Sequence, residues 1–147
     1  MFLGLYEHTL DDKGRLVLPR KYRAALEPGC VVAKGHDGSI HVWPRDEFER
    51  YLEASSSLPP TRGRVRSFRR SLTSTATDQA IDRAGRISLP DRLRRYAGLD
   101  KDVVVTGADD HLELWSPEAW AEIEATDDEI FRNMDEDLEA GFGGATR

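Results

Sequence analysis

The feature of this sequence that most constrains its fold is an internal duplication. Residues 11–19 recur as residues 82–90, with Asp, Gly, Arg, Leu and Pro at the same positions in both segments. A second match follows in the same order, after a slip of one position, and it pairs Gly35, Asp37 and Trp43 with Gly107, Asp109 and Trp115. Two matches in the same order indicate that one structural unit is present twice.

Both copies predict the same series of short elements. Each opens with a turn in which Asp can accept backbone N–H bonds and Gly tolerates a positive φ. A short strand follows, over 15–18 or 86–89, and its alternation places the apolar residues on one face and Arg15 or Arg86 on the other. A helix that starts at a proline, a hairpin and a second helix complete each copy.

The size of each copy predicts how the two are arranged. A unit of about 45 residues is near the limit for independent folding, so the copies are expected to pack on each other. We therefore predict an α+β fold in which two pseudo-symmetric repeats form one domain. We place a first repeat over 5–49, a linker with an Arg-rich helix over 50–76, a second repeat over 77–121 and an acidic tail over 122–147.

The net charge of −6 hides an uneven distribution. Residues 1–121 contain 19 Lys and Arg against 18 Asp and Glu, whereas residues 122–147 contain 2 against 9. Basic residues cluster over 13–23, 62–70 and 83–95. The acidity of the chain therefore belongs to its tail, and it does not exclude nucleic acid as a partner of the remainder.

The arginine that follows each turn is the strongest candidate for a binding residue. In a single turn of this kind the arginine is more often solvated, or paired with the aspartate four residues before it, but two copies on rigid turns favour a binding role. An arginine can bind a phosphate or the edge of guanine with two hydrogen bonds. We expect Arg15 and Arg86 to contact DNA and Lys13 and Arg83 to attract phosphate. The turn residues expected to position them are Asp11, Gly14, Asp82 and Gly85.

Catalytic and metal-binding patterns are missing from the sequence. The four histidines have no metal-ligand spacing such as H-x-x-x-H, and a single cysteine excludes an internal disulfide and a cysteine-based zinc site. Neither a G-x-S-x-G motif nor a Gly-rich phosphate loop occurs. We therefore expect no enzyme, no cofactor and no metal. Because the N-terminus lacks a signal-peptide pattern and no apolar run approaches about 18 residues, we expect a cytoplasmic protein without a membrane partner.

Three features keep alternatives open. The Arg-rich segment 62–70 fits a solvated helix face, a subunit contact or a source of phosphate affinity. The tail has a weak amphipathic pattern, formed by Ile130, Phe131, Met134 and Leu138, which fits either docking on a basic face of a neighbour or a mobile segment. Aromatic residues at element ends fit a core or subunit interface better than base stacking, and these are Trp43, Phe48, Trp115 and Trp120.

The duplicated motif and the opening segment, residues 2–10, resemble the MraZ family over roughly residues 1–125. The resemblance implies an AbrB-like swapped-hairpin (SpoVT-AbrB) fold, with two such units fused in one chain. It also implies a bacterial regulator of the division and cell-wall gene cluster, which forms a closed ring and binds short direct repeats upstream of its own operon. The D-x-x-x-R signature, which carries DNA contact in the family, falls on Asp11/Arg15 and Asp82/Arg86. Lys13 matches a basic family position, and the second copy has Ala84 there instead.

Together these observations predict a sequence-specific DNA-binding transcriptional regulator that acts on double-stranded DNA at the nucleoid as a homo-oligomeric ring. A ring suits small units whose aromatic element ends need partners, and it multiplies one small basic patch by the number of subunits. The alternative is an oligomeric scaffold or an antitoxin-like protein-interaction module that uses the acidic tail. A small-molecule substrate is not expected.

Overall fold

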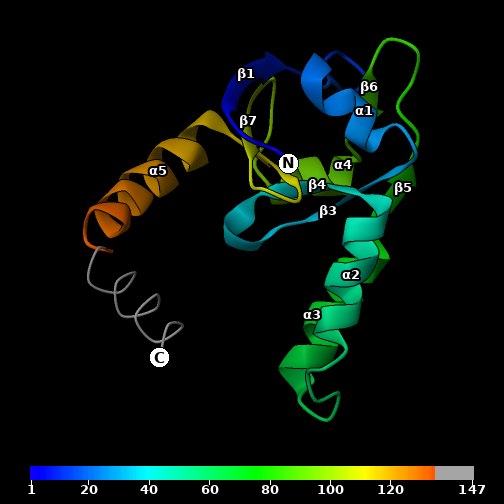
Figure 1. The fold of residues 1–147 in the computed structure, drawn as a ribbon, viewed down its shortest axis with the longest axis vertical. Coiled ribbons are helices and arrows are strands. Elements are labelled where there is room, and N and C mark those ends of the chain that lie inside the picture. The colour runs from blue at the N-terminus through cyan, green and yellow to red at the C-terminus, as the bar shows by residue number, and fades with distance from the viewer. Residues whose placement is uncertain (135–147) are drawn as a thin grey trace, which may run out of the picture. The chain divides into compact units, whose positions relative to one another are not determined.

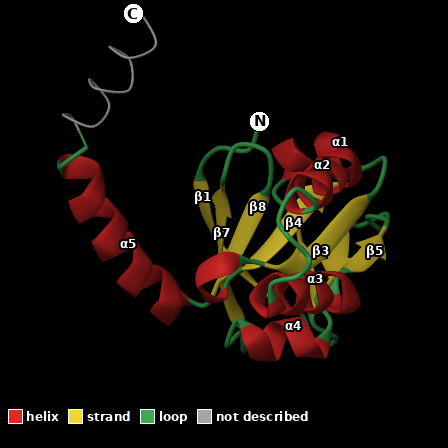
Figure 2. Cartoon of the chain, turned by 90° about the horizontal axis from the view of Figure 1, so that it is seen from below, coloured by secondary structure: helices red, strands yellow, loops and turns green. Residues whose placement is uncertain are grey.

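A six-stranded antiparallel sheet lies at the centre of the computed structural model, which describes residues 1–134 (Figure 1). Figure 2 shows its strands side by side, with β1 at one edge and β5 at the other. In order across the sheet the strands are β1 (Leu5–Thr9), β7 (Asp102–Gly107), β8 (Leu112–Trp115), β4 (Ile40–Pro44), β3 (Cys30–Lys34) and β5 (Thr77–Gln79).

The two copies exchange their outer strands in this sheet. β1 belongs to the first copy and pairs with β7 of the second, whereas β5 opens the second copy and pairs with β3 of the first. At the centre β4 pairs with β8, and His41 lies opposite Glu113, its equivalent in the second copy. An approximate two-fold axis therefore passes between β4 and β8. The predicted α+β fold of two pseudo-symmetric, intertwined repeats is confirmed.

A separate two-stranded ribbon is formed by β2 (Arg15–Val17) and β6 (Arg86–Ser88), again one strand from each copy. Leu16 lies opposite Ile87, and the two residues are 0% and 2% exposed. Both belong to the larger hydrophobic core. Because side chains alternate along a strand, Arg15 and Arg86 lie on the outer face of the ribbon.

Short helices follow the ribbon strands. In the first copy the 3-10 turn η1 (Arg20–Tyr22) continues into α1 (Arg23–Leu26), and α4 (Asp91–Tyr96) is the equivalent helix in the second. Each is preceded by a proline, whose fixed φ suits the start of a helix. Tyr22, Leu26 and Leu93 complete the larger core, which lies between the ribbon, these helices and one face of the sheet.

The opposite face of the sheet carries a second, smaller core under α2 (Arg45–Ser55) and α3 (Gly63–Thr75). Figure 1 shows α2 and α3 on one side of β3 and β4, with α1 and β6 on the other. A 3-10 turn, η2 (His36–Gly38), joins β3 to β4. Along β4, Ile40 and Val42 belong to the larger core and Trp43 to the smaller one, so His41 points to the α2 side of the sheet.

The chain divides into two units, Met1–Pro117 and Glu118–Arg147. The described element of the second unit is α5 (Pro117–Arg132), which continues into the segment expected as the acidic tail. Leu138 of the expected amphipathic pattern, and the end of that tail from residue 135, lie outside the described residues. Within residues 1–134 no helix is long and apolar enough to cross a membrane.

Candidate nucleic-acid interface

The first of the two duplicated turns is ordered by a single carboxylate. Oδ1 of Asp11 accepts hydrogen bonds from the backbone N–H groups of Lys13 and Arg15, both at 2.9 Å. Oδ2 of the same residue accepts a bond from Nε of Arg15 at 2.7 Å. The N–H of Gly14 closes the turn by donating to the Asp11 carbonyl at 3.0 Å. One side chain therefore fixes both the turn and the guanidinium.

The second turn repeats this arrangement. Oδ1 of Asp82 accepts from the backbone N–H groups of Ala84 and Arg86 at 2.9 Å, and Oδ2 accepts from Nε of Arg86 at 2.7 Å. The pKa values of Asp11 and Asp82 lie below their ordinary value, chiefly because the backbone N–H of Arg15 or Arg86 donates to the carboxylate. Both aspartates thus have the bonding expected of positioning groups, whereas contact of the arginines with DNA stays a prediction.

The turn glycines are required by backbone conformation, and each lies against an arginine side chain. Gly14 has a φ of 73° and Gly85 a φ of 77°, a region that side-chain-bearing residues rarely adopt. A Cβ at Gly14 would lie 2.8 Å from the guanidinium carbon of Arg94, and a Cβ at Gly85 would overlap the guanidinium of Arg23. Each turn is therefore packed against an arginine of the other copy.

Arg23 and Arg94 are site residues that the sequence analysis did not single out. Nε of Arg23 donates to the Leu18 carbonyl at 3.1 Å, and Nε of Arg94 donates to the Leu89 carbonyl at 2.9 Å. Each adds a positive charge beside the turn of the other copy. The sequence contained a signal that could have identified them: the two arginines are 71 residues apart, the same separation as the two turns.

The ribbon brings the two turn arginines onto one face. Its register pairs Arg15 with Ser88 and Val17 with Arg86, so the arginines are diagonal neighbours across the two strands. Their guanidinium groups approach the same carboxylate, since Nη1 of Arg86 lies 4.0 Å from the Asp11 oxygen that Arg15 contacts. The arginine side chains are 28% and 31% exposed, so a ligand can reach them from solvent.

The two turns lie at opposite ends of the ribbon. The N–H of Leu18 donates to the Gly85 carbonyl and the N–H of Leu89 to the Gly14 carbonyl, both at 2.9 Å, which fixes each turn beside the strand of the other copy. Lys13 in the first turn and Arg83 in the second, the other two predicted binding residues, are exposed. We refer to β2, β6 and their flanking turns, with Lys13, Arg15, Arg83 and Arg86, as the basic ribbon.

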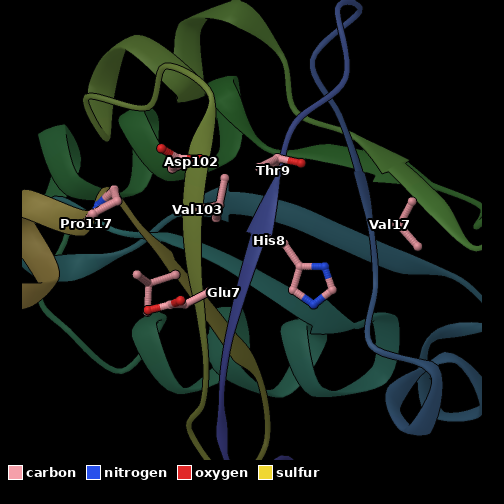
Figure 3. Close-up of a pocket in the computed structure, with 8 residues that line it drawn as sticks. Glu7, His8, Thr9, Val17, Asp102, Val103 and Pro117 are labelled. Carbon is pink, nitrogen blue, oxygen red and sulfur yellow. The ribbon is translucent and has the colours of Figure 1, made fainter.

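A groove beside the basic ribbon has a different character. It has a volume of about 700 Å³ and is lined mainly by residues of β1 and β7. Figure 3 shows His8 pointing from β1 toward the strand that carries Val17. Glu7 and Asp102 also line the groove. Two carboxylates would repel a phosphate, so we do not include this groove in the candidate DNA surface.

Comparison with known proteins identifies the family. The family model described as "MraZ protein, putative antitoxin-like" matches residues 1–71 and matches again over residues 72–140. This chain belongs to the MraZ family. Two successive matches agree with a duplicated chain, and the resemblance read from the turns and the opening segment is confirmed.

Individual relatives match nearly the whole chain. A protein of Thermobifida fusca (strain YX) is 41% identical over 141 residues, which are 96% of this chain and 99% of its own length. Proteins of Mycobacterium ulcerans (strain Agy99) and Mycolicibacterium smegmatis (strain ATCC 700084 / mc(2)155) are both 47% identical over 131 residues, 89% of this chain and 92% of theirs. All three are named "Transcriptional regulator MraZ".

Proposed function

We propose that this MraZ-family protein is a transcriptional regulator that binds double-stranded DNA through the basic ribbon. The observation that carries the proposal is the pair Arg15 and Arg86, held on the outer face of a two-stranded ribbon with a basic turn at each end. The major groove of B-DNA admits a two-stranded ribbon, and arginine binds the guanine edge there with two hydrogen bonds. The names of the relatives support this function and describe a class of proteins that are not enzymes.

Each residue of the basic ribbon has a defined part in the proposal. Arg15 and Arg86 contact bases or phosphates, and Lys13 and Arg83 attract the phosphate backbone. The two turn aspartates are not DNA ligands in this proposal. Each carboxylate is paired with the arginine of its own turn and holds that guanidinium group in one orientation. Fixing the arginines before binding lowers the entropy that binding costs.

We propose that the target is a set of short direct repeats upstream of the protein's own operon, within the division and cell-wall gene cluster, bound in the cytoplasm at the nucleoid. The family resemblance is the source of this finer proposal. The approximate two-fold symmetry of the basic ribbon is compatible with it, since repeated protein surfaces match repeated DNA sites.

We also propose that several copies close into a ring through two different surfaces. The groove lined by Glu7 and Asp102 lies at the β1 edge of the sheet, whereas the Arg-rich helix α3 packs beside β3, toward the opposite edge. Leu5 is 46% exposed and lies on β1, whose outer edge pairs with no strand among residues 1–134. Two different, complementary surfaces form a head-to-tail interface that can close. Light scattering of the full chain checks this, and a monomer at micromolar concentration would contradict it.

The DNA-binding proposal is tested by titrating DNA from upstream of the protein's own gene with the full chain, by gel retardation and fluorescence anisotropy. We expect retardation and an affinity that falls steeply with salt, on the order of a thousandfold between about 50 and 200 mM, because neutralised phosphates release counterions. The scaffold or antitoxin-like alternative predicts no retardation of this DNA. An affinity that does not change with salt would contradict the proposal.

A further inference from the structure

A second cluster of chemically active side chains lies on the α2 side of the sheet, away from the basic ribbon. His41 of β4 lies opposite Glu113 of β8, and His111 precedes β8 in the hairpin turn. Nε2 of His41 is 3.3 Å from Oε2 of Glu113, and Nε2 of His111 is 3.6 Å from the same oxygen. One donor atom from each of the three residues lies within 4.8 Å of the other two. We call these residues the His-His-Glu cluster.

The spacing of the cluster fits a metal ion better than a hydrogen-bond network. His41 is only 5% exposed, yet both of its ring nitrogens, and Nε2 of His111, have no hydrogen-bond partner among the described residues. The Nε2 atoms of the two histidines are therefore close to Oε2 of Glu113, but their geometry is not that of hydrogen bonds. Around a tetrahedral ion with bonds of about 2.1 Å, donor atoms lie roughly 3.4 Å apart, close to the two separations observed here. Buried unpaired nitrogens are costly, and a cation bound beside Glu113 would satisfy the Nε2 atoms of His41 and His111.

The surroundings of the cluster hold its ligands in place. Nδ1 of His111 donates to Oδ1 of Asp110 at 2.7 Å, which leaves Nε2 as the nitrogen that faces the cluster. A carboxylate on the second nitrogen of a histidine is typical of metal sites. Trp43 stacks on the His111 ring at 4.2 Å, and Tyr51 stacks on Trp43 at 4.9 Å. The ring orientations are thus fixed by packing as well as by the Asp110 contact.

We propose that His41, His111 and Glu113 bind a divalent transition-metal ion of the Zn²⁺ class and that this ion joins the two repeats at their approximate two-fold axis. Two imidazoles and one carboxylate are a ligand set that Zn²⁺ takes, with a fourth position left for water or an outside donor. Mg²⁺ and Ca²⁺ prefer oxygen ligands and are excluded by the two nitrogens. The first repeat supplies His41 and the second supplies the other two ligands, so the ion would link strands β4 and β8 across copies.

The test uses the full chain, stripped of metal by chelation and titrated with Zn²⁺ in a calorimeter. We expect one equivalent of Zn²⁺ to bind per chain. Zn²⁺ should raise the melting temperature, and Mg²⁺ should leave it unchanged. With Co²⁺ as the probe, we expect the visible absorption bands of a low-symmetry site. Zn²⁺ binding with no change in melting temperature would contradict the link between repeats, and the absence of stoichiometric binding would overturn the site.

Substitutions separate the metal site from a purely structural cluster. Glu113→Gln and His111→Gln remove one ligand each and are expected to abolish stoichiometric Zn²⁺ binding, and because both side chains are partly exposed the variants should fold. Asp110→Asn should weaken binding by about ten- to a hundredfold, as for other carboxylates that orient a ligand. His8→Ala, on β1 of the same sheet, is the matched control and should leave binding unchanged. Full Zn²⁺ affinity in the Glu113→Gln and His111→Gln variants would overturn the assignment.

Discussion

Replacing both Arg15 and Arg86 by alanine is expected to weaken binding of the upstream DNA by on the order of a hundredfold or more. A good two-bond contact between arginine and guanine contributes about 1–3 kcal/mol, and about 1.4 kcal/mol corresponds to a factor of ten in affinity. Two such contacts in one subunit therefore account for this loss, and a multimeric protein would lose them in every subunit. Anisotropy titrations of the double variant and the unchanged protein, at one salt concentration, measure the effect.

The double variant should remain folded. Both arginine side chains are partly exposed, and the backbone N–H bonds that order each turn do not involve the guanidinium groups. Ion pairs near the surface contribute about 0–1 kcal/mol each, so the loss of these two pairs should leave the chain folded. A melting temperature close to that of the unchanged protein would show that lost binding is not lost folding.

A charge-matched control uses two arginines of α2. Arg45 pairs with Asp78 and Arg50 with Glu47, and both arginine side chains are more than half exposed. The Arg45→Ala, Arg50→Ala double variant removes the same charge outside the basic ribbon, so it should reduce DNA affinity far less. Equal losses in the two double variants would mean that net charge, and not the ribbon, determines binding. Unchanged affinity in the Arg15, Arg86 variant would exclude the ribbon as the DNA contact.

The parts of the site that could be predicted from the sequence are those set by local rules. The alternation of Arg15, Leu16 and Val17 predicted which face of the strand is outward, because side chains of a strand alternate whatever it pairs with. The Asp of each turn predicted hydrogen bonds to backbone N–H groups, and the Gly predicted a positive φ, because both are properties of the turn itself. Because the whole motif recurs later in the chain, the sequence also predicted two turns of related geometry instead of one ordinary turn.

The parts that could not be predicted depend on which strands pair. The sequence does not show that β1 crosses to β7 or that β2 joins β6, and this pairing is what makes Arg15 and Arg86 diagonal neighbours. Arg23 contacts Gly85 only because the helix of one copy lies beside the turn of the other. His41 and Glu113 belong to different copies and become neighbours through the β4–β8 register, so spacing rules for metal ligands cannot find them.

The buried face of the ribbon gives the largest expected effect on stability. Leu16→Ala should lower the free energy of unfolding by about 2–5 kcal/mol, the range for removing a fully buried leucine side chain. Leu16 is 0% exposed and lies opposite Ile87, in a ribbon of only three residue pairs. Chemical denaturation followed by circular dichroism measures the loss. A change below about 0.5 kcal/mol, the size expected of an exposed surface position, would mean that the ribbon is not packed on the larger core.

The neighbouring residue supplies the control for that variant and connects its stability to DNA binding. Val17 follows Leu16 in β2 but lies on the outer face and is 41% exposed, so Val17→Ala should change the free energy of unfolding by less than about 0.5 kcal/mol. Leu16 makes no contact with DNA in our proposal, yet its side chain anchors the strand that carries Arg15. Leu16→Ala should therefore weaken DNA binding even where the chain remains folded, because a loosened ribbon holds its arginines less firmly. Full affinity in a folded Leu16→Ala variant would contradict the proposal that a rigid ribbon presents them.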